Sequence, residues 1–244
     1  MSEQTNERPP GSNGRATQID WTCVEADLDT RGHARLPQLL APRECRALIE
    51  FFGDESRFRS LVSMERYRYG RGDYRYFAAP LPPLVESLRR DLYAPLAQIA
   101  DRWEERLGAS RRYPPTLEAF LAQCHAAGQT RPTPLLLHYQ EEGFNCLHQD
   151  RYGEVAFPLQ VVVLLSRPGR DFQGGELLLT EQRPRMQSRG EAISLSLGEG
   201  LVFPNQTRPV EGVRGHYRAT VRHGVSRLHA GERYALGIIF HDAE

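Results

Sequence analysis

The chain of 244 residues lacks lysine altogether, so all 31 of its basic residues are arginine. A GC-rich genome is the simpler explanation of this bias, and selection for arginine chemistry is the alternative. The chain also has no net charge, because 31 acidic residues balance the arginines at pH 7. The total charge therefore gives no indication of a strongly basic nucleic-acid-binding protein, although local basic patches remain compatible with it.

Long apolar runs are missing as well. No segment approaches the length of a membrane span, and the polar N-terminus lacks the apolar stretch of a signal peptide. The four cysteines are scattered, without CxxC or zinc-ligand spacing, at positions 23, 45, 124 and 146. These absences predict a reduced, cytoplasmic protein without membrane association. The apolar content of 40% suits one or two domains with a proper core.

The first half of the chain has a helical pattern. Residues 1–17 are rich in Gly, Pro, Asn and Ser and predict a disordered tail. Residues 18–133 predict a mainly helical support region. Its expected helices lie within 41–53, within 82–108 as one helix or as two divided near Pro95, and within 116–128.

The sequence pattern changes after Pro134, where short apolar runs follow one another without intervening helical segments. Eight such runs predict strands at 134–140, 144–150, 158–166, 175–181, 192–198, 200–203, 217–223 and 233–241. So many short strands in one continuous stretch favour an α+β chain with a mainly β core over 134–244, as a jelly roll or small barrel.

One tripeptide in this half carries metal-binding chemistry. In an extended strand, residues two apart share a face, so His148 and Asp150 would both point into the barrel, and Cys146 with them. The pair is short enough to occur by chance. A two-histidine, one-carboxylate site needs one further histidine from a strand distant in sequence, and it leaves three positions open on an iron ion. For Cys146 a small buried filler is favoured over a redox role.

The last expected strand carries an arginine on a face of small residues. Arg233, Ala235 and Gly237 share this face, which leaves a hole beside a fixed guanidinium. Such a hole suits a small dicarboxylate, because arginine grips a carboxylate with two parallel hydrogen bonds. An exposed arginine on an edge strand is the alternative.

The combination resembles the Fe(II)/2-oxoglutarate-dependent dioxygenases, and within them the prolyl-hydroxylase-like branch. The residues that carry the resemblance are Tyr139, Gly143, His148 and Asp150 in YxxxGxxxxHxD spacing, the GGEL turn at 174–177, and HGVxxLxxGxRYxL at 223–236. The match covers about 134–244. The whole chain also resembles an uncharacterised bacterial family whose name refers to oxidative repair of damaged nucleic acid.

This resemblance implies a double-stranded β-helix of the cupin-like jelly-roll kind, with the helical region packed on it. It implies that His148, Asp150 and His223 bind Fe(II), and that Arg233 pairs with the C5 carboxylate of 2-oxoglutarate, to which Tyr139 adds a hydrogen bond. The co-substrates would be 2-oxoglutarate and O2. A departure from the family pattern is the insert at 204–222, which places His216 as a less favoured alternative to His223.

Two arginine-rich regions are candidates for substrate contact. Residues 63–77 interleave arginine and tyrosine, and Arg68, Arg71 and Tyr74 would hold phosphates and stack bases. The alternative is a β-hairpin turning at Gly70–Gly72, with its tyrosines on the barrel and its arginines in solvent. The insert would place Arg208 and Arg214 over the mouth of the site or form a plain surface excursion.

Three functions remain open from the residues. The first is hydroxylation of a protein side chain or small metabolite by an Fe(II)/2-oxoglutarate dioxygenase. The second is oxidative demethylation of alkylated nucleobases, which needs a pocket for a flipped or single-stranded base. The third is a non-catalytic jelly-roll binding module, which the complete ligand set disfavours. The expected partner is a small-molecule or protein substrate, with nucleic acid possible, and no feature defines an oligomeric state.

Overall fold

The computed structural model describes residues 14–150 and 152–244. Most of the tail predicted at 1–17 lies outside these residues, while Arg15–Gln18 forms the short helix α1. The other helices are α2 (Trp21–Arg31), α3 (Pro42–Phe51), α4 (Pro83–Arg106) and α5 (Leu117–Ala126), with short 3-10 turns η1 (Glu55–Arg57) and η2 (Glu65–Tyr67). Among the described residues, no helix is both long and apolar enough to span a bilayer.

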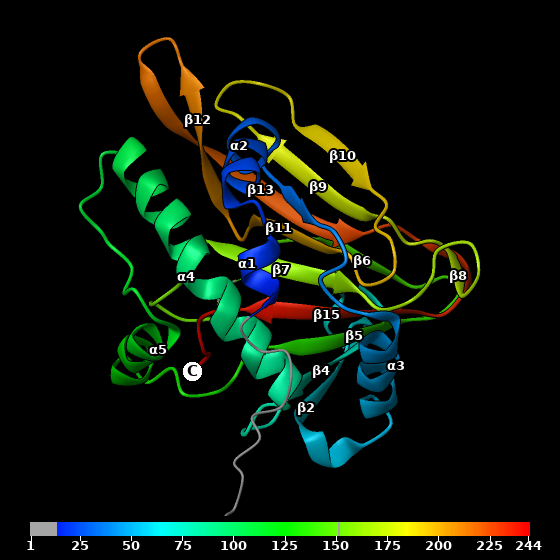
Figure 1. Ribbon diagram of the computed structural model, residues 1–244. Coiled ribbons are helices and arrows are strands. Elements are labelled where there is room, and N and C mark those ends of the chain that lie inside the picture. The colour runs from blue at the N-terminus through cyan, green and yellow to red at the C-terminus, as the bar shows by residue number, and fades with distance from the viewer. Residues whose placement is uncertain (1–13, 151) are drawn as a thin grey trace, which may run out of the picture.

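Two antiparallel sheets face each other (Figure 1). The first has the order β1-β11-β7-β15-β5-β4-β2, and the second has the order β10-β9-β13-β6-β3, with β12 paired to β13. The strands before the predicted core are β1 (Ala34–Leu36), β2 (Phe58–Ser63), β3 (Gly70–Arg71) and β4 (Asp73–Phe77). Those of the seven-stranded sheet that follow are β5 (Leu135–Tyr139), β7 (Leu159–Leu164), β11 (Gly200–Pro204) and β15 (Arg233–Ile239). The six-stranded sheet adds β6 (Phe144–His148), β9 (Leu177–Gln182), β10 (Arg189–Ile193), β12 (Thr207–Gly212) and β13 (Gly215–Val225). A separate pair joins β8 (Phe172–Gly174) to β14 (Leu228–Gly231).

The sequence of β7 explains how the sheets and helices are layered. All of its residues except Gln160 are apolar, and the strand is buried on both faces. Val162 and Leu164 pack in the core between the two sheets, whereas Val161 and Val163 pack in the core that contains the helices. A strand covered on both sides carries apolar residues on both faces, so the usual alternation of apolar and polar residues is absent here. The predicted jelly roll with helices on one side is therefore the observed architecture.

Helix α4 covers the outer face of the seven-stranded sheet (Figure 1). It is one continuous helix, and Pro95 lies inside it. The interior proline removes a helix hydrogen bond at a cost of about 3 kcal/mol. The buried stripe that includes Leu88, Leu92, Leu96 and Trp103 offsets this cost by packing on the sheet.

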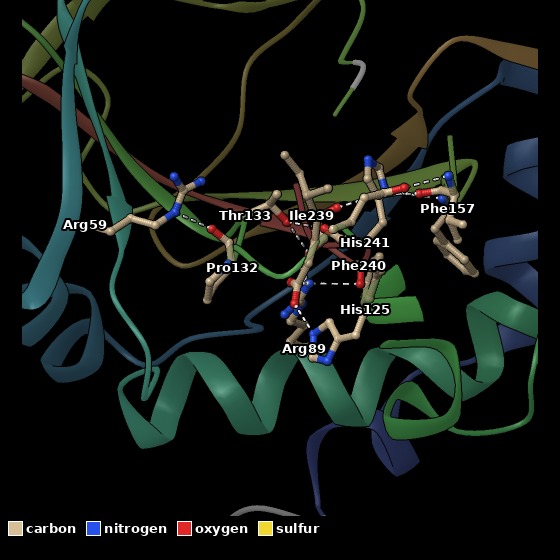
Figure 2. Close-up of polar contacts among 12 residues, drawn as sticks. Arg59, Arg89, His125, Pro132, Thr133, Phe157, Ile239, Phe240 and His241 are labelled. Atoms are coloured by element: carbon tan, nitrogen blue, oxygen red, sulfur yellow. Dashed lines mark hydrogen bonds and ion pairs between the residues drawn. The ribbon is translucent and has the colours of Figure 1, made fainter. Parts of the chain in front are cut away.

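A buried arginine ties α4 to the end of β15. Arg89, only 3% exposed, donates to the carbonyls of Ile239 and Phe240 and to Oδ1 of Asp242, each at 2.8 to 2.9 Å (Figure 2). His125 Nε2 on α5 lies 3.0 Å from Oδ2 of the same aspartate. The helical region thus fixes the C-terminal end of the strand that begins at Arg233.

The region at 18–133 also contributes strands. β1 pairs with β11, and β4 pairs with both β2 and β5. The strands β1, β2 and β4 therefore belong to the same sheet as β15. The mainly helical pattern expected for this region did not include β1, whereas the alternative of a hairpin at 63–77 included β4. The insert at 204–222 is likewise not a loop, because β12 and the first half of β13 form a long hairpin that projects beyond the sheet (Figure 1).

Candidate active site

A cavity of about 270 Å³ lies between the two sheets. The wall from the seven-stranded sheet comes from β4, β5, β7 and β15, and the facing wall comes from β6 and β13. His148, Asp150, His223, Tyr139 and Arg233, the five residues predicted for iron and co-substrate, all line this cavity. Strand pairing explains the meeting, because β13 sets His223 opposite His148, and β15 sets Arg233 opposite Tyr139.

The three predicted metal ligands form a tight group. One nitrogen or oxygen atom from each of His148, Asp150 and His223 lies within 4.8 Å of the others. The Nε2 atom of His223 is 3.2 Å from Oδ2 of Asp150, and Nε2 of His148 is 3.6 Å from Oδ1. The two imidazole rings have centroids 4.2 Å apart.

Neighbouring groups fix how these side chains are presented. The Nδ1 atom of His148 lies 2.7 Å from the carbonyl of Cys146 and must donate to it, so Nε2 carries the lone pair that faces the cavity. The Asp150 carboxylate accepts a hydrogen bond from the Tyr152 hydroxyl at 2.9 Å. Gln160 Nε2 lies 3.4 Å from Nε2 of His223.

The electrostatics keep the site ready for a cation. Burial alone would raise the pKa of Asp150, but the adjacent imidazoles of His223 and His148 outweigh it and hold that pKa well below its usual range. Burial, together with the charge of His223, lowers the pKa of His148. An ionised carboxylate beside a neutral imidazole is the form in which both bind a metal.

The cavity also holds a buried cation. Arg233 is 2% exposed, and its Nε has no hydrogen-bond partner in the described part of the chain. The Tyr139 hydroxyl is buried as well, and the guanidinium carbon sits 5.6 Å from the centre of its ring. The Glu176 carboxylate acts on Arg233 electrostatically, but among the described residues no carboxylate forms a direct ion pair with it. A buried guanidinium without a direct ion pair is costly, so it fits an anion such as a carboxylate. Ala235 and Gly237 on the same strand face leave the space for it.

The donor set fits the predicted Fe(II) better than structural zinc. Two imidazoles and one carboxylate match the facial arrangement that leaves positions open on iron, whereas structural zinc takes four ligands and commonly sulfur. Among the described residues, no sulfur joins the group. Cys146 was expected to point into the barrel, but it is exposed, because the pairing of β6 with β13 shifts register between His223 and Val225.

The insert residues do not reach the cavity, which corrects their prediction as substrate contacts. Arg208 is buried elsewhere, where its Nε donates to Glu181 at 2.6 Å and NH1 donates to the carbonyl of Asp29. Arg214 is exposed in the turn between β12 and β13. His216 is exposed opposite Glu211 in this hairpin, away from the cavity, so the geometry favours His223 as the second histidine.

The arginine- and tyrosine-rich stretch at 63–77 divides between the cavity and the surface. Tyr74 lines the cavity. Arg68 is exposed, with a left-handed φ of 60°, and Arg71 is exposed with Nε 3.4 Å from Glu65. The stretch forms a hairpin of β2 and β4, but the connection is longer than a turn at Gly70–Gly72 and crosses to β6 through β3.

Two of the tyrosines in this connection stack at the surface. Tyr67 and Tyr69 are half exposed, with ring centroids 5.6 Å apart and planes 19° from parallel. Tyr69 also lines the cavity, so the stacked pair lies beside its mouth.

Three residues around the metal group were not predicted. Tyr152 follows Asp150 by two positions, and the alternation that pairs His148 with Asp150 could have extended to it. Gln160 is a polar residue inside an otherwise apolar strand, which is itself a signal of a site. Tyr76 lies far from Tyr152 in the sequence and meets it only in the folded chain, so no spacing in the sequence indicates this contact.

Three other histidines do not line the cavity. His33 is buried 3.7 Å from Glu191, and His241 is fully buried just after β15. The His138 ring stacks on the Tyr234 ring, with centroids 4.3 Å apart.

Solved structures share this fold at low sequence identity. A prolyl-4-hydroxylase of Pseudomonas putida superposes with a TM-score of 0.51 at 18% identity, over 89% of this chain and 96% of that one. A prolyl hydroxylase of Trichoplax adhaerens, solved with a peptide fragment of hypoxia inducible factor, gives 0.54 at 16% identity over 95% and 92%. An oxidoreductase of the 2OG-Fe(II) oxygenase family from Burkholderia pseudomallei gives 0.53 at 15% identity over 93% of both chains. The fold is therefore that of the 2OG-Fe(II) oxygenases, as the sequence predicted.

The sequence comparisons define the family. Residues 72–243 match the Oxygenase-NA family, described as an oxygenase catalysing oxidative methylation of damaged DNA. Two uncharacterized proteins of Mycobacterium tuberculosis, from strains CDC 1551 / Oshkosh and H37Rv, are each 44% identical over 230 residues, which is 94% of this chain and 93% of theirs. The chain belongs to the Oxygenase-NA family, and the predicted enzyme class is confirmed. The predicted cofactors, Fe(II) and 2-oxoglutarate, are those in the family name of the Burkholderia pseudomallei oxidoreductase, whose fold this chain shares.

Proposed function

We propose that the protein is an Fe(II)/2-oxoglutarate-dependent dioxygenase that oxidises a C–H bond of a protein side chain or small metabolite. The observation that carries the proposal is the shared cavity. It holds a His–Asp–His group at one place and, at another, a buried arginine that forms no direct ion pair among the described residues, with a buried phenol. The first group can bind a metal, and the second can bind a carboxylate of a small dicarboxylate, so one cavity can bind both.

The residues divide the work between metal and co-substrate. His148, Asp150 and His223 hold the metal, and the tautomer of His148 is set by the Cys146 carbonyl. Arg233 would hold the distal carboxylate of 2-oxoglutarate, because a guanidinium can donate two hydrogen bonds to a carboxylate. Iron bound there supplies the activation of O2 that is coupled to conversion of 2-oxoglutarate to succinate and CO2.

The wall of the cavity orients the bound molecules and excludes water. Leu177, Phe203 and Val225 line it beside the metal group, and Ala235 and Gly237 line it beside Arg233. In this apolar surrounding, the attraction between the guanidinium and a carboxylate is stronger than it would be in water. The Tyr139 hydroxyl adds one hydrogen bond to the same anion.

The test is binding of 2-oxoglutarate to the Fe(II)-loaded protein under anaerobic conditions by calorimetry, followed by succinate release in air. Arg233→Gln removes the charge from the cavity, and Arg222→Gln is the matched control on the exposed face of β13. Loss of a buried charged partner costs about 2–5 kcal/mol, so affinity should fall about 30-fold or more in Arg233→Gln alone. Wild-type protein that binds no 2-oxoglutarate, or equal affinities in both variants, would refute the proposal.

A second candidate is oxidative demethylation of alkylated nucleobases. The specific observation that favours it is the stacked pair of Tyr67 and Tyr69 at the cavity mouth, with Arg66 and Arg68 exposed beside it. Aromatic side chains of this kind stack bases of single-stranded nucleic acid, and arginines bind the phosphates. The description of the Oxygenase-NA family names damaged DNA as the substrate, which supports a nucleic-acid substrate for this candidate.

A methylated single-stranded oligonucleotide separates the two candidates. Under base demethylation it should stimulate succinate release and yield formaldehyde, with binding that weakens steeply as salt rises. Tyr69→Ala should then lower affinity by about 1–3 kcal/mol, whereas Leu61→Ala, an exposed apolar residue on β2, should not. Release that the oligonucleotide leaves unchanged would favour hydroxylation of a side chain or metabolite.

A further inference from the structure

The two oxygens of the Asp150 carboxylate each lie near one histidine. Oδ2 lies 3.2 Å from Nε2 of His223, and Oδ1 lies 3.6 Å from Nε2 of His148. Oδ1 also accepts the hydrogen bond from the Tyr152 hydroxyl at 2.9 Å. The phenol therefore holds the carboxylate in an orientation in which each oxygen faces one histidine.

Tyr152 is itself held by a chain of contacts from the opposite sheet. The Tyr76 hydroxyl, on β4, lies 3.1 Å from the Tyr152 hydroxyl. The guanidinium of Arg59 covers the ring of Tyr76 at 4.5 Å from its centre. Arg59 is fixed in turn, because its Nε donates to the carbonyl of Pro132 at 2.9 Å (Figure 2). The chain runs from β2 through β4 to the carboxylate.

We propose that Tyr152 is a positioning residue for Asp150. Its hydroxyl donates a hydrogen bond to Oδ1 and resists rotation of the carboxylate, so that the carboxylate keeps its orientation toward the two histidines. A ligand held in this way loses less conformational entropy when a metal binds. This inference rests on the metal site proposed above. Groups that orient metal ligands in this way typically change metal affinity by about 10- to 100-fold.

The Tyr152 ring also packs against other side chains, so the test must remove the hydroxyl and keep the ring. The ring also contacts Tyr76 and His241, with centroids 6.2 Å and 5.8 Å away. Tyr152→Phe keeps the ring and removes only the hydroxyl. Tyr234→Phe is the matched control, because the Tyr234 hydroxyl bonds Glu232 at 3.3 Å and does not line the cavity.

The experiment is a titration of the full chain with Co(II), a spectroscopic substitute for Fe(II), followed by visible absorption. In Tyr152→Phe we expect affinity about 10-fold or more below wild type, with altered Co(II) bands that report the change in coordination. Tyr234→Phe should match wild type in both. Tyr76→Phe leaves the hydrogen bond to Asp150 but removes its support, so its loss of affinity should be smaller than that of Tyr152→Phe.

The outcomes separate this inference from the proposed function. Wild-type protein that binds no Co(II) would refute the metal site, and with it both proposals. Wild-type binding with an unchanged affinity and spectrum in Tyr152→Phe would overturn the positioning role alone. A larger loss in Tyr76→Phe than in Tyr152→Phe would also overturn it, because the hydroxyl of Tyr152 would then not be the group that orients the carboxylate.

Discussion

The stability of the protein should fall in mild acid because of one buried histidine. His241 is fully buried just after β15, where its Nδ1 accepts the backbone N–H of Phe157 at 3.2 Å and its carbonyl accepts from Thr133 (Figure 2). Burial, and then the charge of Arg89, lower its pKa to about 4. The folded state therefore needs the neutral imidazole as an acceptor.

The sign and size of the effect follow from this pKa. An unfolded chain protonates its histidine near the ordinary pKa of about 6.5, whereas the folded chain resists protonation down to about 4. Between these values the unfolded state binds more protons, so the free energy of unfolding falls as the pH falls. The full difference corresponds to about 3 kcal/mol, of which about 2 kcal/mol should be lost between pH 7 and pH 5.

Urea unfolding of His241→Asn and wild type at both pH values measures this contribution. The amide oxygen of asparagine takes the place of Nδ1 and cannot be protonated, so the variant should lose about 2 kcal/mol less than wild type on this change of pH. His229→Asn, an exchange of an exposed histidine on β14, controls for the loss of one titrating imidazole. Equal pH dependence in His241→Asn and wild type would refute the reasoning.

Three further substitutions test how the core and the site are held. Asp242→Ala leaves the buried Arg89 without its counter-ion and should lower the free energy of unfolding by about 3 kcal/mol or more, as measured in urea. Arg208→Met should cost a similar amount, about 3 kcal/mol, but leave the affinity for 2-oxoglutarate unchanged in calorimetry, because its partner is Glu181 and not a ligand. Gly175→Ala should weaken 2-oxoglutarate binding by about 10-fold in the same assay, since a Cβ there would come within 3.0 Å of Cδ of Arg233 at a φ of +66°.

The sequence was sufficient for the site wherever a residue's role depends on local spacing. Period-two alternation placed His148 with Asp150, and Arg233 with Ala235 and Gly237, and the structure puts them all in one cavity. The same rule failed at Cys146, because a register shift between β6 and β13 breaks the alternation. Nothing in the local residues indicates that shift, which the partner strand imposes.

Contacts between distant segments were the main features that the sequence did not reveal. Arg208 reads as a solvent-facing cation in an arginine-rich stretch, yet it is buried because Glu181 on β9 meets it. The sequence left open whether 82–108 forms one helix or two divided near Pro95, and α4 is one helix because its tertiary burial outweighs the cost of the proline. Strand β2, with the sequence FRSLVS, has too few apolar residues for the sequence alone to distinguish it from a loop. Only its pairing with β4 in the structure shows that it is a strand.

These long-range contacts connect the N-terminal half to the proposed site. Arg233 begins β15, and the other end of that strand is held by Arg89 of α4 through the carbonyls of Ile239 and Phe240. The three proposed metal ligands lie on the side of the opposite sheet, so their distance from Arg233 depends on the position of β15. A helix that contributes no residue to the cavity lining thus helps to fix the position of Arg233. We therefore propose that the support region predicted at 18–133 also helps to set the geometry of the site.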